Sequence, residues 1–586
     1  MLIEKLYYFT DTKDKIFLSI LFLLAILIGF IELIGVASIV PFIGLLNDPD
    51  YIADNKYFLM INQYLLFDNE SLVYISGVFL IMSFVLVNLL NAYNLWLTTR
   101  YGATLSHKIS MLTKKSYLEQ SYKYFVNADI ASISKNILEE SGSLAESIFI
   151  PFMQIISKII IVVFISILLI TVNFEAFMYS SLIIVLLYIF LFKNIKNKIK
   201  DFGSMRLQAN DERFKNVNDC LNSIKDVKYY GAENYYLNNF SKSQNNFLNL
   251  TVKCIILSTM PKYIIEIIGF GGFFSVILYM KYLGIDISMY LPVIGLFIFA
   301  AYRLLPSINQ IYALSSTLRF HMPALDIIYN VVTLNKSKNF NYNIKKMNSL
   351  ITFNNVSFSH NHNNLILKNI NLEIMKGTVN AIIGETGAGK TTLLDLLLGF
   401  YQPRSGIINM SDQLVDIDSR KIKIGYVPQK ISFIDDSVYQ NIAFGSNNRD
   451  IDINKINHII ETVKLKDLVS NLPNKAYEKI GENGVKLSGG QLQRIGMARA
   501  LYLNPKILIL DEATNALDIN TELDIFNSII KSYEDLTIIW ITHRPSSLSL
   551  CNNIFYLNKG SIKYLNNEDN SIKDDAYIKN LLQKEI

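Results

Sequence analysis

The stretch Gly384-Glu385-Thr386-Gly387-Ala388-Gly389-Lys390-Thr391-Thr392 lies between the apolar run 379–383 and the helix-forming run 393–400. A glycine-rich turn between a strand and the first turn of a helix directs several backbone N–H groups toward one point. At that point the helix dipole and the Lys390 ammonium can hold nucleotide phosphates, and the Thr391 hydroxyl can face Mg²⁺. A chance glycine turn is the alternative, but it would not be flanked by a strand and a helix. The sequence therefore predicts a site for ATP or GTP.

A second predicted strand, at 506–512, ends in two acidic residues. Its continuous apolar run is typical of a parallel strand that is buried on both faces and ends at the carboxyl edge of the sheet. Asp511 is placed to organise Mg²⁺, and Glu512 is placed to orient or deprotonate the attacking water. Alone, this acidic pair would indicate only a solvated strand end. Together with the phosphate loop it predicts nucleotide hydrolysis.

A third segment, Ser488-Gly489-Gly490-Gln491, opens a helical run that continues toward residue 501. Serine and two glycines at the start of a helix make another N-terminus suited to phosphate. Because one active site needs only one phosphate-binding helix N-terminus, the second such N-terminus is expected to bind the nucleotide of another copy of the chain. The sequence therefore predicts a head-to-tail homodimer in which the Ser488 turn of each copy closes the ATP site of its partner.

The residues before about 320 are much more apolar than the rest of the chain, which as a whole is 51% hydrophobic and 18% charged. Several apolar stretches are long enough to cross a bilayer, which takes roughly 20 helical residues. Any one of them could be a buried core helix, but their succession favours an all-α, six-span transmembrane domain over 1–322 with long cytoplasmic helical extensions. The predicted spans are 16–46, 72–97, 148–171, 174–193, 255–281 and 288–314.

Basic residues predict the orientation of these spans. The connections 98–147 and 194–254 are rich in Lys and Arg, whereas the charged residues of 47–71 are mainly acidic. Because cytoplasmic loops carry the excess of basic residues, both long connections and both termini are predicted to be cytoplasmic, in a multi-pass protein of the inner (plasma) membrane. An Asn- and Lys-rich linker is predicted at 323–349, followed by an α/β P-loop nucleotide-binding domain over 350–586. The basic loops account for the net charge of +5, and no nucleic-acid partner is predicted.

The second half of the chain resembles the nucleotide-binding domain of ABC transporters. The motifs that carry this resemblance are the phosphate loop, Tyr426-Val427-Pro428-Gln429, Ser488–Gln491, Asp511-Glu512, Asn515-Ala516-Leu517-Asp518 and Ile541-Thr542-His543-Arg544. The resemblance implies ATP and Mg²⁺ as cofactors, with catalytic roles for Glu512, His543 and Gln429. It implies Mg²⁺ contacts from Thr391, Gln429 and Asp511. The residues implied to bind ATP are His360, Gly384, Glu385, Thr386, Gly387, Ala388, Gly389, Lys390, Thr391, Thr392, Ser488, Gly489, Gly490, Gln491, Asp511 and Asp518.

One position departs from the family pattern. His360 stands where ABC transporters usually have a tyrosine that stacks on adenine. An imidazole offers less stacking surface than a phenol ring, so weaker base binding is expected. Phe358 could contribute the stacking surface instead.

Charges inside the predicted spans are candidates for substrate contacts, because a charge in a bilayer is costly. Lys262 and Arg303 both fall in the cytosolic half of their spans when the helices are counted at about 1.5 Å per residue. Two cations at similar depth could hold a phosphate or pyrophosphate headgroup in a substrate cavity. The alternatives are snorkelling to the interface and pairing with Glu32 or Glu266.

Three shorter segments also have predicted roles. The segment 56–67 is apolar but too short to span, and it predicts an interfacial helix on the external face, with a plain loop as the alternative. The stretches 122–135 and 230–240 match the positions of the short coupling helices in the exporter-type ABC fold, with an ordinary polar hairpin as the alternative.

Nearly the whole chain resembles the bacterial flippases for lipid-linked oligosaccharides of protein N-glycosylation. The residues that carry this resemblance lie at 30–43, 89–93, 261–270 and 301–309. It implies a homodimer that uses ATP to flip a polyprenyl-pyrophosphate-linked glycan from the cytoplasmic to the outer leaflet of the lipid bilayer. Asn88 and Gln310 are neutral where further basic residues are expected. Export of a lipid A-like lipid or a hydrophobic drug is an alternative. An ATP-gated channel or regulator is another, although intact Glu512 and His543 argue for a pump.

Overall fold

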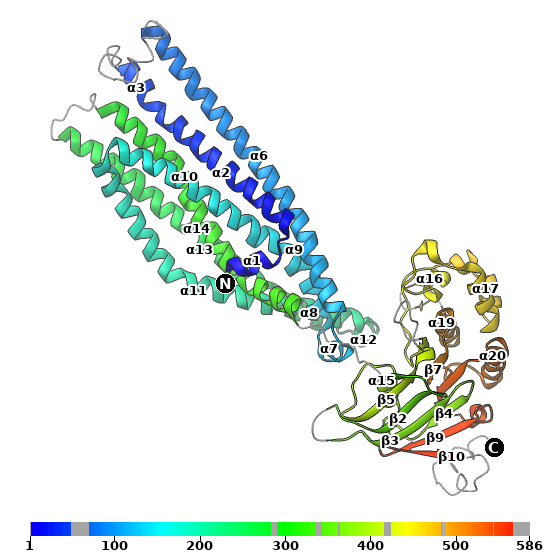
Figure 1. Cartoon of the computed structure of the whole chain (residues 1–586). Helices are drawn as coiled ribbons and strands as arrows, with labels where there is room; N and C mark the ends of the chain where they lie inside the picture. The colour runs from blue at the N-terminus through cyan, green and yellow to red at the C-terminus, as the bar shows by residue number, and fades with distance from the viewer. Residues whose placement is uncertain are drawn as a thin grey trace. The chain divides into compact units, whose positions relative to one another are not determined.

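The computed structural model describes residues 2–47, 69–282, 290–334, 343–360, 364–414, 423–481, 484–485, 487–542 and 544–565. It contains two compact units, one of Met1–Gln120 and Tyr124–Ser337 and the other of Ser121–Lys123 and Lys338–Ile586. In Figure 1 the first is the helical unit in blue to green, and the second is the mixed α/β unit in green to red. The predicted external helix at 56–67 lies outside the described residues.

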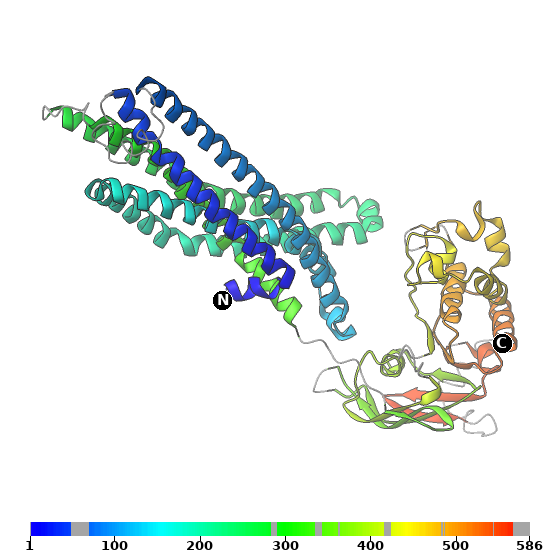
Figure 2. The same ribbon diagram turned by 45° about the horizontal axis from the view of Figure 1, so that its top comes forward.

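The first unit is built from long helices that pack lengthwise. α11 packs along α13, and α10 packs against both α2 and α14, so these helices run beside one another in both views (Figures 1 and 2). The helices are α1 (Leu2–Tyr8), α2 (Thr12–Ala37), α3 (Ile39–Asn47), α6 (Asn69–Leu118), α7 (Tyr122–Asn127), α8 (Ile130–Lys135), α9 (Ser141–Leu144), α10 (Ile150–Val172), α11 (Phe174–Asn222), α12 (Ile224–Tyr230), α13 (Glu233–Tyr282) and α14 (Leu291–Thr333), with π-helical turns η1 (Asn136–Glu140) and η2 (Ala145–Phe149) on either side of α9.

Within the described residues, 5 helical segments are long and apolar enough to cross a membrane. They are Thr12–Leu46, Ser71–Leu118, Ile130–Val172, Glu233–Gly272 and Leu291–Thr333. These segments overlap all the predicted spans except 174–193, which forms the first part of α11 and is not among them. The predicted count of six spans is therefore not confirmed, whereas a multi-pass helical membrane unit is supported.

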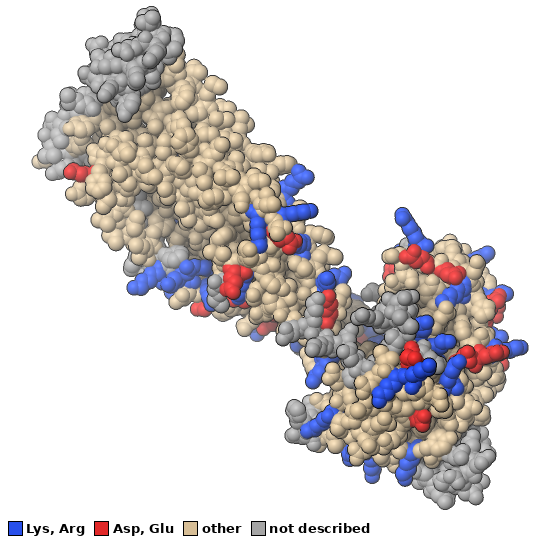
Figure 3. Space-filling model, viewed as in Figure 1, with Lys and Arg blue, Asp and Glu red and all other residues tan. Residues whose placement is uncertain are grey.

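Charged side chains gather toward one end of the helical unit. In the view of Figure 3, Lys, Arg, Asp and Glu concentrate at its lower end, and most of the remaining described surface is free of them. Large apolar side chains such as Leu23, Ile81 and Val163 are exposed on the spanning helices. Such a surface is costly in water and suits hydrocarbon.

The predicted linker at 323–349 starts too early. α14 continues through Pro323 to Thr333, and β1 begins at Asn343. A proline normally interrupts a helix because it removes one backbone hydrogen bond. Here Ala324, Leu325 and Ile328 are buried immediately after it, and this packing favours continuation of the helix.

The second unit contains two sheets. The smaller has the order β1-β5-β2-β3, and the larger has the order β10-β9-β4-β8-β7-β6. All pairs in the larger sheet are parallel except β10 with β9. The strands are β1 (Asn343–Lys345), β2 (Ser349–Phe358), β3 (Leu367–Met375), β4 (Val379–Ile383), β5 (Ser405–Ser411), β6 (Ile424–Val427), β7 (Ile507–Asp511), β8 (Thr537–Ile541), β9 (Asn553–Asn558) and β10 (Ser561–Leu565).

Every residue of β4, β7 and β8 is buried, as their uninterrupted apolar runs predict. One face of the sheet packs against α15 and the smaller sheet, and the other packs against α17, α19 and α20. On the second face Trp540 stacks on Phe526 with ring centroids 3.7 Å apart. The helices are α15 (Lys390–Leu397), α16 (Val438–Ile442), α17 (Ile453–Thr462), α18 (Lys466–Asn471), α19 (Gly489–Tyr502), α20 (Ile519–Ser532) and α21 (Pro545–Leu548).

Candidate ATP site

The predicted phosphate loop lies between the end of β4 and the start of α15. A side chain on Gly384 would bring its Cβ to 2.2 Å from the carbonyl oxygen of Leu557 in β9, so only glycine fits there. Gly389 precedes α15 with a backbone φ of 105°, a conformation that residues with a side chain rarely adopt. Between them, residues 385–387 are exposed and Ala388 is buried. The loop therefore presents its tip to solvent while its two ends are fixed by close packing.

Lys390 lies across this loop. Its Nζ donates hydrogen bonds to the carbonyl oxygens of Gly384, at 2.8 Å, and Glu385, at 3.0 Å. Burial lowers the pKa of the Lys390 ammonium, and Glu512 and Asp511 oppose this shift. At the start of the helix Thr391 is exposed and Thr392 is buried. A cation and a helix N-terminus therefore meet at one place, as binding of phosphates requires.

The acidic pair lies at the carboxyl end of β7, beside the end of β6. Gln429, just after β6, donates from Nε2 to Oε2 of Glu512 at 2.8 Å, and Asn515 donates to the same oxygen at 3.2 Å. Glu512 itself has φ of 49°, an uncommon conformation for a residue with a side chain that is often found at active sites. Tyr426 donates to Oδ2 of Asp511 at 3.4 Å. The structure thus brings Gln429, Asp511 and Glu512 together.

Negative charge is concentrated around Asp511. Burial, and then the charge of Glu512, raise the pKa of the Asp511 carboxyl. Burial, and then the charge of Asp511, raise the pKa of Asp395 on α15 to about 6. Asp395 is not among the residues predicted from the sequence, because its proximity to Asp511 depends on how α15 packs on the sheet. A divalent cation would relieve this repulsion, since it stabilises ionised carboxylates.

These residues fit Mg²⁺ in a nucleotide site. In the described part of the chain, no three His, Cys, Asp or Glu side chains form a metal cluster. Mg²⁺ beside nucleotides usually takes one or two protein ligands and completes its shell with phosphate oxygens and water. Asp511 and the Thr391 hydroxyl supply oxygen donors of that kind.

The Ser488 segment forms the exposed N-terminus of α19. The Ser488 hydroxyl accepts a hydrogen bond from the Gln491 amide, and the Gln491 side chain accepts one from the Ser488 amide. A Cβ on Gly490 would lie 2.9 Å from the carbonyl oxygen of Ala516. The two polar side chains therefore cap the helix, and the exposed turn remains available to an anion or another copy.

Asp518 caps a second helix, α20. Its Oδ2 accepts a hydrogen bond from the backbone amide of Thr521 at 2.9 Å, and this bond lowers the pKa of the carboxyl. His543 lies outside the described residues, whereas its neighbour Arg544 forms an ion pair with buried Glu522. The ATP roles of Asp518 and His543 stay predictions.

The surroundings of His360 exclude one of the predicted alternatives. The His360 ring lies edge-on to Phe358 and Tyr401, with centroids 5.0 Å away in both cases. Phe358 is 5% exposed and belongs to the core under the smaller sheet, so it cannot also offer a free face to a base. Tyr401 supports His360 and was missed because it follows α15, far from residue 360 in the sequence.

The two predicted substrate cations each lie near an acid. Arg303 Nη1 is 3.2 Å from Glu32 Oε1, and their side chains are 18% and 6% exposed. Lys262 Nζ is 3.8 Å from Glu266 Oε1, and both side chains are more exposed. Arg303 lines a small pocket with Glu32, Ser83 and Phe84, and Lys262 is not part of its lining. The structure therefore does not bring Lys262 and Arg303 into one described pocket.

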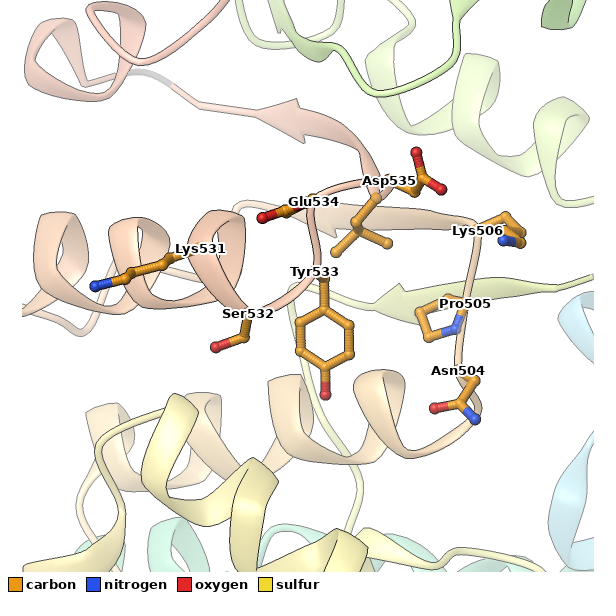
Figure 4. A pocket seen from close by; sticks show the side chains of 9 residues that line it. Asn504, Pro505, Lys506, Lys531, Ser532, Tyr533, Glu534 and Asp535 are labelled. Atoms are coloured by element: carbon orange, nitrogen blue, oxygen red, sulfur yellow. The ribbon is translucent and has the colours of Figure 1, made fainter.

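Another hollow, of about 540 Å³, lies at the opposite edge of the large sheet, where β7 and β8 begin. Figure 4 shows Tyr533 between Lys506 and Lys531, which lie on opposite sides of its ring. Parallel sheets bind ligands at the carboxyl ends of their strands. The hollow lies at the other ends and its cations do not converge, so it is separate from the candidate ATP site.

Substitutions of Lys390 and Glu512 should separate binding from hydrolysis. Lys390→Ala is expected to weaken ATP binding by about tenfold or more, because a charge-assisted phosphate contact is lost. Glu512→Gln keeps the shape but removes the carboxylate, so it should retain ATP binding and lower turnover by about a hundredfold. Equilibrium binding and steady-state ATPase assays on the purified protein measure the two effects. Wild-type turnover in Glu512→Gln would contradict the role given to Glu512.

Asp395→Asn should stabilise the protein in a pH-dependent way. The folded state holds the pKa of Asp395 at about 6, above the ordinary 3.8, so ionising this carboxyl costs folding free energy. The stability from the neutral carboxyl is complete below about pH 4 and is lost as the pH rises through about 6. At pH 8 the variant should therefore melt about 2–4 °C above wild type. The difference should shrink toward pH 4.5, and an equal difference at both pH values would contradict this environment for Asp395.

Comparisons with known proteins agree with this geometry. Residues 367–515 match the family model of the ABC transporter ATP-binding region, described as "ABC transporter". Residues 17–303 match the model of the ABC transporter transmembrane region.

Two relatives and one solved structure extend the match beyond these segments. The heterocyst differentiation ATP-binding protein HepA of Nostoc sp. (strain PCC 7120 / SAG 25.82 / UTEX 2576) is 30% identical over 75% of this chain and 72% of its own length. An ATP-dependent lipid A-core flippase of Ralstonia nicotianae (strain ATCC BAA-1114 / GMI1000) is 27% identical over 64% of each chain. The structure of a bacterial Atm1-family ABC exporter with ATP bound has a TM-score of 0.79 at 20% identity and covers 98% of this chain and 99% of that one.

The phosphate loop, the acidic strand end beside Gln429 and the apolar helical unit thus occur together in one chain. The two family models match these same units. The chain is an ATPase coupled to transport, and it belongs to the ABC exporter family.

Proposed function

We propose that this protein flips a polyprenyl-pyrophosphate-linked oligosaccharide from the cytoplasmic to the outer leaflet of the inner (plasma) membrane. The observation that carries the proposal is Arg303, a cation that is 18% exposed among apolar spanning helices. A membrane protein retains such a charge mainly where it has a function. A guanidinium suits phosphate, because it can donate two parallel hydrogen bonds. Lys262 is a further proposed contact for the headgroup.

The transporter is proposed to be a homodimer. Two ATP molecules would lie between the phosphate loop of one copy and the Ser488 turn of the other. Lys390 would bind the phosphates, Gln429 and Glu512 would position the attacking water, and His543 would contact the γ-phosphate. Bound at Thr391, Asp511 and Gln429, Mg²⁺ would neutralise charge on the phosphates.

The proposed topology has six spans, with residues 174–193 of α11 as the fourth. The basic connections 98–147 and 194–254 support a cytoplasmic position for both termini and for the ATP unit. Residues 122–135, which include α7 and α8, and residues 230–240, where α12 ends and α13 begins, are proposed as coupling helices.

A lipid A-like lipid is the second candidate substrate. The relative from Ralstonia is named a lipid A-core flippase, and lipid A also combines apolar chains with phosphate groups. Both candidates are amphipathic anions, so Arg303 alone does not distinguish them. A direct comparison of the two lipids is therefore needed.

Reconstitution in liposomes should show ATP-dependent movement of a labelled polyprenyl-pyrophosphate glycan. An enzyme that cleaves the glycan is added on the side of the membrane that carries the ATP units. As ATP is hydrolysed, less of the labelled lipid should remain accessible to this enzyme. Glu512→Gln liposomes provide the matched control, because the same protein is present without turnover. An excess of unlabelled lipid A tests the second candidate by competition.

Two outcomes would reject the leading proposal. The first is labelled glycolipid that stays in place while ATP is hydrolysed. The second is transport of lipid A at a much higher rate than that of the glycolipid, which would favour the alternative substrate.

A further inference from the structure

Arg544 is a charged residue close to the ATP site that the proposed function does not use. It lies between β8 and α21, and its side chain is 25% exposed. Its Nη1 donates to the carbonyl oxygen of Leu517 at 2.9 Å, and its Nη2 donates to that of Asn515 at 3.0 Å. Nη1 also donates to Oε2 of Glu522 at 2.5 Å. One guanidinium therefore binds both ends of the segment 515–517 and ties them to α20, the helix that carries Glu522.

The acid that anchors Arg544 is deeply buried. The Glu522 side chain is 1% exposed, and its other oxygen, Oε1, accepts a hydrogen bond from the Ser547 hydroxyl at 2.9 Å. A buried carboxylate is stable as an anion only when it is paired and hydrogen-bonded. Arg544 supplies the counter-charge, and its planar guanidinium presents further N–H groups in a fixed geometry. Those groups reach the two backbone carbonyls, so the segment 515–517 is held in one position relative to α20.

The segment 515–517 is also packed against α19. The amide of Ala516 donates to Oε1 of Gln493 at 3.0 Å. A Cβ on Gly490 would lie 2.9 Å from the carbonyl oxygen of Ala516, so the two backbones approach closely. α19 begins at the Ser488 turn. Arg544 and α19 therefore hold the same three residues.

Asn515 connects this segment to the residue predicted to act on the attacking water. Its Nδ2 donates to Oε2 of Glu512 at 3.2 Å, and the same oxygen accepts from Gln429. Glu512 has a backbone φ of 49°, and a residue with a side chain keeps such a conformation only where its surroundings hold it. A shift of the Asn515 backbone would carry its amide away from the carboxylate. The orientation of Glu512 thus depends on Arg544 through one intermediate residue.

We propose that Arg544 is a positioning residue for ATP hydrolysis, which holds the backbone of Asn515 so that the Asn515 amide orients the Glu512 carboxylate toward the attacking water. Arg544 acts through Asn515 and is not itself a catalytic residue. A displacement of about 1 Å at a reacting group can lower a rate by roughly a hundredfold, so a bond one residue removed from Glu512 affects turnover. The inference rests on the role proposed for Glu512 in the ATPase, and it holds for any transported lipid.

Arg544→Lys tests this role in the purified full-length protein. An ammonium keeps the positive charge beside Glu522 but cannot reproduce the planar fork that reaches the two carbonyls. We expect kcat for ATP to fall by about tenfold, because a charged hydrogen bond is lost. KM, the affinity for a non-hydrolysable ATP analogue and the melting temperature should stay close to wild type. Arg544→Met is less suitable, because it leaves Glu522 buried without a counter-charge and destabilises the folded state.

Arg499→Lys is the matched control. Arg499 lies on α19, and its guanidinium also donates to two backbone carbonyls, those of Asn441 at 2.8 Å and Ser432 at 2.9 Å. These carbonyls lie in and before α16, outside the segment 515–517. The control substitution should therefore lower the melting temperature but keep kcat within about twofold of wild type.

A double-mutant cycle identifies the route by which Arg544 acts. Asn515→Ala removes the amide that contacts Glu512 but keeps the backbone carbonyl that Arg544 binds, and it should lower kcat by about tenfold. If Arg544 acts through Asn515, the further addition of Arg544→Lys lowers kcat by no more than about twofold. Independent effects would instead multiply, to about a hundredfold below wild type.

Three results would overturn the inference. The first is wild-type kcat in Arg544→Lys. The second is multiplication of the two effects in the double variant, which would mean that Arg544 acts by another route. The third is an equal fall of kcat and of melting temperature in Arg544→Lys and Arg499→Lys, which would leave Arg544 a structural role only. An error in the role of Glu512 would appear separately, as wild-type turnover in Glu512→Gln, and the transported lipid is tested independently of all these variants.

Discussion

The ATP site depends on one close contact between two strands. Gly384, at the end of β4, lies so near the Leu557 carbonyl of β9 that a Cβ would be 2.2 Å from the oxygen. This approach fixes where the loop leaves the sheet, and so fixes the direction of α15 and of its N-terminal amides. Lys390 then bonds back to the Gly384 carbonyl. The cation and the helix dipole converge at the end of β4, where only a residue without a side chain fits so close to β9.

The sequence predicted those parts of the site that are local along the chain. A buried apolar strand followed by glycines and a helix identifies the phosphate loop, and a similar strand identifies Asp511 and Glu512. It could not predict contacts that depend on tertiary packing. Asp395 approaches Asp511 only through the packing of α15, and Phe358 is excluded from base stacking because it lies in the core. α14 continues beyond Pro323 because Leu325 and Ile328 are buried, which local propensity does not reveal.

In the helical unit, too, the charged residues could be identified from the sequence, whereas their partners could not. Hydropathy and the basic connections were enough to predict a multi-pass unit, and counting along helices identified Lys262, Arg303 and their acidic neighbours. Which acid neutralises which cation depends on the packing of α2 against α10 and of α10 against α14. That packing places Glu32 of α2 beside Arg303 of α14, with Arg303 Nη1 3.2 Å from Glu32 Oε1. In this account ATP supplies the driving force for transport.

The central claim is that each ATP site is shared between two copies, with a phosphate loop from one and a Ser488 turn from the other. The most direct measurement is the ATPase activity of purified heterodimers that combine a Lys390→Ala chain with a Ser488→Arg chain. One composite site is intact in such a dimer and none is intact in either parent homodimer. The account predicts activity well above that of both parents. A heterodimer as inactive as its parents, or wild-type activity in the Ser488→Arg homodimer, would contradict it.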